Sequence, residues 1–382
     1  MRRAKHRRPR WLADLVVVAL AVGLFAGGWW LGRMTAPQPA PIRPVRPDST
    51  TSSQATAPSA QAATTFDATA QRDLGAQLAA LKVSGTALII RHGRVIAQYV
   101  HGLANAATGR PNTVTTMYEI DSMQKSLTAG LFMRQVNAGQ VALTTPLAQF
   151  FPRFKTSPQI TMAHLLHMTS GLRTKGVLTP RYTTDAALVQ ANVAKLINEP
   201  AVRGHYQYTP INYLLLAGIG EQLTGQTYAQ SFQTVYVEGL KLAHTRFAYA
   251  LRADDPAAVG YTTTAYTDPQ RVSDSRLHAE LGTGQVFMSA LDFYHAARAL
   301  LSGQLLGRGR DALYDAKANY SGGFFMRKGF VQTNGTGYGF FSTARFTPDG
   351  QNAIVLLSNV QAKNRATVNN TVGRLFTQYA LK

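Results

Sequence analysis

Ser122 and Lys125 stand three residues apart in the segment Ser122-Met123-Gln124-Lys125. We expect this segment to begin a helix that runs to about residue 136, and helical spacing then puts the hydroxyl and the amine on one face. A serine becomes a nucleophile at neutral pH only beside a base, and a lysine can act as that base once desolvation or a neighbouring charge lowers its pKa. The spacing therefore predicts an acyl-enzyme on Ser122. Taken alone, the pattern also fits an ordinary surface serine and lysine.

Five segments place this pair in a wider pattern. They read GTALIIRHGR at 85–94, YEIDSMQKSLTA at 118–129, ITMAHLLHMTSGL at 160–172, YLLLAGIGEQLTG at 213–225 and GLKLAHT at 239–245. In this order they resemble blocks of the serine β-lactamase and penicillin-binding-protein-like family, class C type. The resemblance covers about residues 66–382. It implies a serine hydrolase that needs no cofactor.

Tyr208 is the second catalytic candidate, because Tyr208-Thr209-Pro210 occupies the place of the family's Tyr-x-Asn motif. The resemblance implies that Tyr208 lies beside Lys125 and acts as a proton shuttle. Pro210 stands where the family has asparagine, and proline has no amide group to donate to a substrate carbonyl. We therefore expect a polar substrate contact to be missing at Pro210.

The family's third motif, Lys-Thr-Gly or His-x-Gly, aligns with Thr333-Asn334-Gly335. The resemblance implies that the motif's cation helps to hold a substrate carboxylate, a charge-assisted contact of about 1.5–3 kcal/mol. Thr333 offers only a neutral hydroxyl at this place. Thr336 follows the motif glycine, and its backbone N–H, together with that of Ser122, is implied to hold the oxyanion.

The residue inventory excludes several other chemistries. The chain has no cysteine, which rules out disulfides, thiolate catalysis and cysteine-ligated metals. Neither His-Glu-x-x-His nor His-x-x-Glu-His occurs, so no metal site is predicted. A Gly-x-Ser-x-Gly elbow, typical of α/β-hydrolases, is also absent. We interpret His167 as a structural residue that ends a helix rather than as a base.

One sheet assembled from both ends of the chain is expected to position the catalytic residues. A hairpin is predicted at 85–91 and 94–101, and strand-like runs at 324–327, 338–346 and 353–359 precede a final helix at about 365–381. The long section between them is rich in helical patterns. The predicted fold is α/β: an antiparallel sheet flanked by helices, plus a helical subdomain, as in β-lactamases and DD-peptidases.

The N-terminus is predicted to anchor the chain in a membrane. Six basic residues within positions 1–10 precede an uncharged, largely apolar run at 15–32. At about 1.5 Å per residue, this run nearly crosses a hydrocarbon core of about 30 Å. The positive-inside rule then makes 1–33 a cytoplasmic tail and single-pass anchor of the cell membrane, with the rest of the chain extracellular. A cleaved signal peptide is the alternative, although its apolar stretch is usually about 7–15 residues long.

Residues 34–65 are rich in Pro, Ser, Thr and Ala, and we interpret them as an extracellular stalk below a catalytic domain at 66–382. The net charge is +20, and the chain remains basic when residues 1–33 are set aside. A basic surface outside the cell favours polyanions such as teichoic acids, although a generally basic proteome explains the charge equally well. No nucleic-acid-binding motif is present, so nucleic acid is not an expected partner.

The two altered motifs favour a D-alanyl esterase that acts on (lipo)teichoic acid in the cell wall. Its ester substrate has no carboxylate to anchor, carries an ammonium group and belongs to a polyol-phosphate chain that suits a basic surface. A D-alanyl-D-alanine carboxypeptidase or β-lactamase-like hydrolase, acting on peptidoglycan or β-lactams, is the first alternative. A catalytically lapsed wall-binding protein is the second, because two of the three motifs depart from the family pattern.

Overall fold

The computed structural model describes residues 66–152, 154, 159–174, 181–361 and 363–381. The predicted tail and anchor at 1–33 and the predicted stalk at 34–65 lie outside these residues. Across the described ranges, no helix combines the length and the apolar composition that a membrane crossing requires. The described residues thus belong to the predicted catalytic domain.

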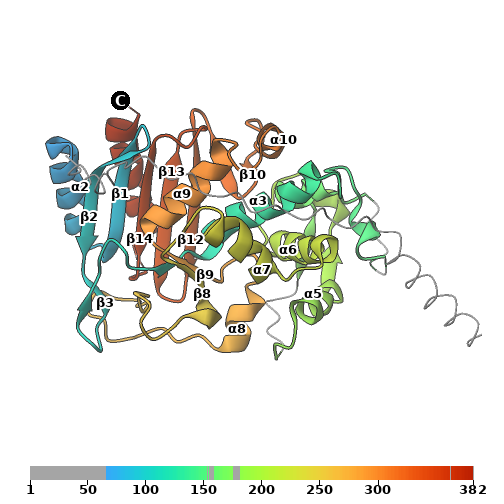
Figure 1. The fold of residues 1–382 in the computed structure, drawn as a ribbon, viewed down its shortest axis with the longest axis horizontal. Helices are drawn as coiled ribbons and strands as arrows, with labels where there is room; N and C mark the ends of the chain where they lie inside the picture. The colour runs from blue at the N-terminus through green and yellow to red at the C-terminus, as the bar shows by residue number, and fades with distance from the viewer. Residues whose placement is uncertain (1–65, 153, 155–158, 175–180, 362, 382) are drawn as a thin grey trace, which may run out of the picture. The chain divides into compact units, whose positions relative to one another are not determined.

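A seven-stranded sheet joins the two ends of this domain (Figure 1). Its order is β10-β11-β12-β13-β14-β1-β2, and all neighbouring strands are antiparallel. The strands are β1 (Gly85–Arg91), β2 (Arg94–His101), β10 (Tyr320–Ser321), β11 (Phe324–Arg327), β12 (Phe330–Gly337), β13 (Phe340–Phe346) and β14 (Ala353–Ser358). In the β1–β14 pair, Gly85 lies opposite Ser358. The prediction of one antiparallel sheet built from both chain ends is confirmed.

Helices cover both faces of the sheet, because alternate side chains of a strand point to opposite sides. Ala87 and Ile89 of β1 pack into a core with α2 and α11, whereas Leu88 and Ile90 pack into a second core with α3 and α9. The four helices are α2 (Ala68–Ala80), α3 (Gln124–Asn137), α9 (Ala290–Leu301) and α11 (Arg365–Leu375). The sheet is thus the middle layer of three, and the 3₁₀ turn that precedes α3 contacts β12 and β13.

A helical subdomain packs against α3. Its central helix, α6 (Ile211–Thr224), contacts α3 and also the shorter helices around it. Pro210 precedes the first residue of α6, and Gly225 ends the helix with a φ of +69°, a conformation that glycine adopts without strain. The other short helices of the domain are α4 (Met162–Leu166), α5 (Asp185–Val193), α7 (Tyr228–Phe232), α8 (Asp274–Ala279) and α10 (Gly309–Leu313).

Short strands and turns connect these layers. The small sheets contain β3 (Leu103–Asn105) with β4 (Arg110–Pro111), β5 (Tyr118–Glu119) with β9 (Val286–Met288) and β8 (Thr245–Phe247), and β6 (Leu172–Thr174) with β7 (Leu196–Asn198). The 3₁₀ segments are Asp121–Met123, Leu147–Gln149, Pro200–Val202 and Ala248–Ala250, and the π-helical ones are Gln233–Glu238 and Phe376–Ala380. Strand β5 is one residue away from the 3₁₀ turn that carries Ser122, so its pairing with β9 fixes where that turn begins.

Candidate active site

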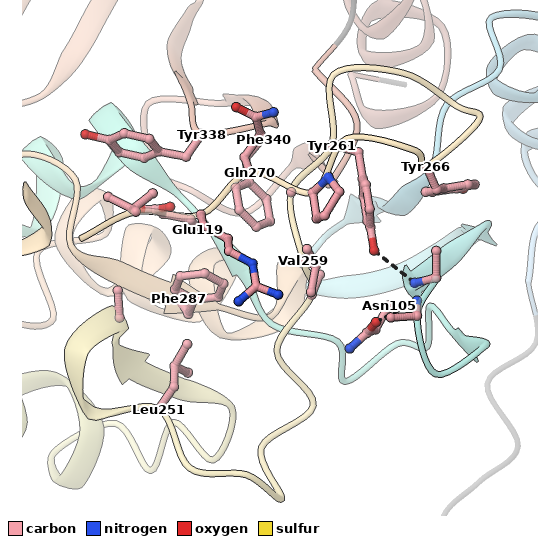
Figure 2. A pocket seen from close by; sticks show the side chains of 18 of the residues that line it. Asn105, Glu119, Leu251, Val259, Tyr261, Tyr266, Gln270, Phe287, Tyr338 and Phe340 are labelled. Carbon is pink, nitrogen blue, oxygen red and sulfur yellow. Dashed lines mark hydrogen bonds between the residues drawn. The ribbon is translucent and has the colours of Figure 1, made fainter. Parts of the chain in front are cut away.

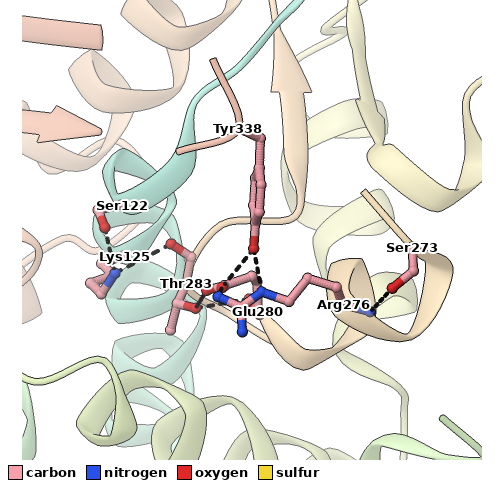
Figure 3. Close-up of polar contacts among 7 residues, drawn as sticks. All are labelled: Ser122, Lys125, Ser273, Arg276, Glu280, Thr283 and Tyr338. Atoms are coloured by element: carbon pink, nitrogen blue, oxygen red, sulfur yellow. Dashed lines mark hydrogen bonds and ion pairs between the residues drawn. The ribbon is translucent and has the colours of Figure 1, made fainter. Parts of the chain in front are cut away.

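Ser122 is half-buried in the 3₁₀ turn that precedes α3, and Lys125 follows it within the first turn of that helix. The Lys125 side chain is 1% exposed. Its Nζ donates to Oγ of Ser122 over 2.9 Å and to the carbonyl oxygen of Thr283 over 3.3 Å (Figure 3). The predicted spacing therefore places the amine directly on the serine hydroxyl, where a neutral Nζ can accept its proton.

Tyr208 reaches the same hydroxyl from the segment before α6. Its Oη donates to Oγ of Ser122 over 2.8 Å, and Nζ of Lys125 lies 5.4 Å from the centroid of its ring. Tyr208 is 42% exposed, whereas Lys125 is enclosed. Tyr208 thus faces the open pocket, where it can donate a proton to a leaving group. Lys125 faces the protein interior.

Strand β12 forms the wall opposite these groups, and its glycine allows it to approach closely. A Cβ on Gly335 would lie 2.2 Å from the carbonyl oxygen of Ile120, so any larger residue would push β12 away from the turn that carries Ser122. Thr333, which is buried, and Asn334 precede this glycine on the strand. The third motif therefore lies beside the nucleophile, as its alignment predicted.

Thr336 lines the pocket after Gly335 and is held by two donors from the other side of the site. Its Oγ1 accepts from Nε2 of Gln361 over 3.0 Å and from Nη1 of Arg365 over 3.4 Å. These contacts fix the side chain of Thr336 through Oγ1. They do not involve its backbone N–H, which is part of β12 and is the predicted oxyanion donor. The oxyanion role of the Ser122 and Thr336 N–H groups stays a prediction.

The pocket over Ser122 has a volume of about 460 Å³ and an aromatic side. Its lining residues are Ser122, Tyr206, Tyr208, Tyr320, Gly323, Phe325, Thr333, Asn334, Gly335, Thr336, Phe341, Arg365 and Asn369. Tyr320 is the centre of the aromatic cluster, with ring centroids 5.9 Å from Tyr206, 6.1 Å from Tyr208 and 5.1 Å from Phe325. Among these described lining residues, Arg365 is the one with a formal charge.

Arg365 was missed by the sequence reasoning. It is the first residue of α11 and is exposed to solvent, and its guanidinium reaches the pocket through Thr336. The only available signal was a basic residue at the start of the predicted final helix, and nothing in the motif pattern connects that position to Ser122. The cation absent at Thr333 is thus present in the pocket on a different element.

Pro210 lies outside the residues that line this pocket. It is exposed at the N-terminal end of α6, two residues after Tyr208. Asn212, the next amide along the chain, is fully buried, and its Oδ1 accepts a hydrogen bond of 2.6 Å from Oγ of Ser170. This amide therefore serves the packing of α6, and the substrate-contact role of position 210 stays a prediction.

His167 caps the C-terminal end of α4 and does not line the pocket. Burial lowers its pKa from the ordinary value. This placement agrees with its interpretation as a structural residue. Within the described ranges, no group of three metal-ligating side chains is arranged to hold an ion.

Buried acidic groups lie directly behind the nucleophile. Asp121 is 5% exposed and adopts a φ of +46°, a left-handed conformation that aspartate adopts more often than most non-glycine residues. Burial and the charge of Glu280 raise the pKa of Asp121 well above its ordinary value, while Lys125 opposes the rise. Glu280 in turn accepts from Oγ1 of Thr283 over 3.0 Å and from the Tyr338 hydroxyl over 3.2 Å (Figure 3). A polar network therefore supports the carbonyl that holds the lysine.

A family model and several known proteins match most of this chain. The family model described as Beta-lactamase matches residues 68–378. The putative penicillin-binding protein PbpX of Bacillus subtilis (strain 168) is 27% identical over 309 residues, which cover 77% of this chain and 75% of the relative. The teichoic acid D-alanine hydrolase of Staphylococcus aureus is 26% identical over 305 residues, again covering 77% of this chain and 75% of the relative.

Solved structures share the fold. FmtA from Staphylococcus aureus superposes with a TM-score of 0.72 at 22% identity, covering 84% of this chain and 90% of that chain. The D-amino acid amidase from Ochrobactrum anthropi SV3 gives a TM-score of 0.67 at 20% identity, with coverage of 82% and 98%. At these identities the likeness concerns the architecture of the domain and not its substrate.

Proposed function

Because this chain belongs to the beta-lactamase family, we propose that it is a serine acyl hydrolase of the cell envelope that works through an acyl-enzyme on Ser122. The main support for this proposal is that Oγ of Ser122 accepts hydrogen bonds from both Nζ of Lys125, at 2.9 Å, and Oη of Tyr208, at 2.8 Å. A nucleophile held between two proton carriers is the arrangement that acyl transfer requires.

In the proposed reaction, Oγ of Ser122 attacks the substrate carbonyl carbon while its proton passes to Lys125 or Tyr208. The carbonyl oxygen becomes an oxyanion held by the backbone N–H groups of Ser122 and Thr336. Tyr208 faces the pocket, so it delivers the proton to the departing alcohol or amine as the bond between the acyl carbon and that leaving group breaks and the carbonyl double bond re-forms. Water then attacks the acyl-enzyme along the same proton route, which releases the acid and restores the serine.

We further propose that the acyl donor is a D-alanyl ester of (lipo)teichoic acid. The aromatic cluster around Tyr320 suits the ammonium of a D-alanyl group, since aromatic faces attract cations. Arg365 lies at the side of the same pocket and suits the phosphates of a polyol-phosphate chain. The similarity to a protein named teichoic acid D-alanine hydrolase supports the same substrate.

The proposal includes the location of the enzyme. Residues 1–33 anchor the chain in the cell membrane, residues 34–65 form a stalk, and the hydrolase domain works outside the cell. The basic cluster ahead of the apolar run in the sequence supports this orientation. Protease treatment of intact cells tests it, because cleavage within 34–65 should release the domain into the medium.

A substrate comparison tests the function. The purified full-length protein is incubated with D-alanylated lipoteichoic acid and, separately, with a muropeptide that ends in D-Ala-D-Ala, and free D-alanine is measured. We expect release from the teichoic acid far above that from the muropeptide. Release from the muropeptide alone would replace the esterase by a carboxypeptidase, and no release with no labelling by a fluorophosphonate probe would favour the lapsed, wall-binding alternative.

A further inference from the structure

A second pocket, of about 610 Å³, shares no lining residue with the catalytic pocket (Figure 2). Most of its wall is apolar or aromatic. The lining includes the aliphatic side chains of Ala248 and Leu251 together with the rings of Tyr261, Phe287, Tyr338 and Phe340. A cavity of this size and composition is typical of small-molecule sites, which also need a few polar groups for orientation.

Glu119 supplies such a polar group. It is 2% exposed, it lines the pocket, and its Oε1 has no hydrogen-bond partner among the described residues. Figure 2 shows its carboxyl group near the aromatic rings of Phe287 and Phe340, whose centroids lie 5.5 Å apart. Buried polar atoms in folded proteins are nearly always paired, so the unpaired Oε1 of Glu119 on a pocket wall points to a partner that comes from outside the chain.

The charges around Glu119 indicate that this partner carries a positive charge. Burial, Asp121 and Glu280 together raise the pKa of Glu119 well above its ordinary value, because a further negative charge is unfavourable there. A positive group beside Glu119 relieves this repulsion, and the aromatic faces around it attract cations as well. Arg271 is the basic residue of the lining, but it is exposed, and no ion pair joins it to Glu119 within the described part of the chain.

We propose that this pocket is a second binding site, separate from the catalytic one, for a small organic cation whose ammonium group pairs with Glu119 and whose apolar body packs against Phe287 and Phe340. An ammonium group beside Glu119 stabilises the carboxylate form, so the acid releases its proton to solvent when the cation binds, and this charge pair gives the site its preference for positive charge. The aromatic and aliphatic wall gives it a preference for an amine with an apolar substituent over a bare inorganic ion. The proposal stands on Glu119 and its surroundings and does not depend on the reaction at Ser122.

Two probes of the same shape test the charge preference. Benzylamine is a cation at pH 7 and benzyl alcohol is neutral, and the affinity of each for the full-length protein is measured by ligand-observed NMR titration. We expect benzylamine to bind the wild type about 10-fold more tightly than benzyl alcohol, the preference that one favourable charge contact gives. Equal affinities for the two probes would overturn the proposal.

Variants locate the site. Glu119→Gln should reduce the preference for benzylamine to less than about 3-fold while the melting temperature reports whether the fold is retained. Ala248→Phe fills the pocket and keeps Glu119, so it should weaken the binding of both probes. It provides the test if Glu119→Gln does not fold. Labelling Ser122 with a fluorophosphonate, which blocks the catalytic pocket, should leave the Glu119-dependent preference for benzylamine unchanged, and a loss of that preference would reassign the binding and refute the proposal.

Neutralisation of Glu119 by Arg271 is the main alternative to a bound organic cation. If its side chain swings inward in solution and neutralises Glu119, the wild type will show no charge preference and Arg271→Gln will create one. That pair of results would also refute the proposal for the native protein. We expect the opposite result, in which Arg271→Gln keeps the preference that the wild type already has.

Discussion

Gly335 lies so close to Ile120 that a Cβ on the glycine would be 2.2 Å from the carbonyl oxygen of the isoleucine. Ile120 is two residues before the nucleophile, and Gly335 precedes the predicted oxyanion donor Thr336. This single backbone contact therefore sets the distance between the two halves of the proposed oxyanion hole. Both the rate of acyl transfer and the geometry of the oxyanion hole should depend on this contact.

Gly335→Ala should lower kcat/KM by at least about 10-fold, because the added methyl forces β12 away from the Ser122 turn, and it should destabilise the domain by about 1–3 kcal/mol. Steady-state kinetics and thermal unfolding measure the two effects. Gly220→Ala is the matched control, since Gly220 lies in α6 with no atom within 4 Å of an added Cβ. An unchanged rate in Gly335→Ala would show that β12 does not set the oxyanion geometry.

Ser122→Ala should abolish turnover and labelling by a fluorophosphonate probe. The side chain is half-buried and its removal leaves no large cavity, so the melting temperature should stay within about 5 °C of the wild type. Turnover above background in this variant would remove Ser122 from the mechanism.

Lys125→Ala and Tyr208→Phe should each reduce kcat by about 10²- to 10⁴-fold, the usual contribution of a positioned acid or base. Tyr208→Phe keeps the ring and deletes only the hydroxyl that contacts Ser122, so it separates proton transfer from packing. Pre-steady-state measurement of acylation distinguishes the step affected. If Tyr208→Phe retains wild-type acylation and deacylation rates, then Lys125 carries the proton alone.

Arg365→Gln should raise KM for D-alanylated teichoic acid by about 2- to 10-fold at low salt, with little change for a small neutral D-alanyl ester. The effect should shrink as ionic strength rises, because Arg365 is exposed and its charge is screened. Arg374→Gln, on the same helix but outside the pocket lining, serves as the control. Equal losses on both substrates would mean that Arg365 acts through Thr336 and not on phosphate.

Glu221→Gln tests a pH effect on stability. Burial raises the pKa of Glu221 to about 8, with Asp185 adding to the rise, whereas an unfolded glutamate titrates near 4.3. The folded state therefore holds this proton more tightly, and the stabilisation is complete below pH 4.3 and is lost as the pH rises towards 8. The melting temperature of Glu221→Gln minus that of the wild type should increase from pH 5 to pH 8. A pH-independent difference would contradict this assignment.

The sheet was predictable from local sequence patterns, whereas the cluster of Ser122, Lys125 and Tyr208 was predictable from the resemblance to the family. Short, nearly continuous apolar runs identify β1 and β14, and the motif blocks fix the order of the catalytic elements along the chain. Arg365 and Glu119 could not be assigned this way. Each acquires its surroundings from elements far away in sequence, and only the packed structure shows that one faces the catalytic pocket and the other a separate cavity.

The pairing of β1 with β14 has a consequence for how the chain folds. Gly85 of β1 cannot pair with Ser358 of β14 until Ser358 has been synthesised. A ribosome that adds about 5–20 residues per second reaches Ser358 on the order of 10–50 s after Gly85. Until then β1 and β2 form at most a hairpin with α2 on one face, and such a small unit is marginally stable in water. The nascent chain therefore exposes one of its most apolar strands throughout synthesis, and we expect a holding chaperone to accompany it.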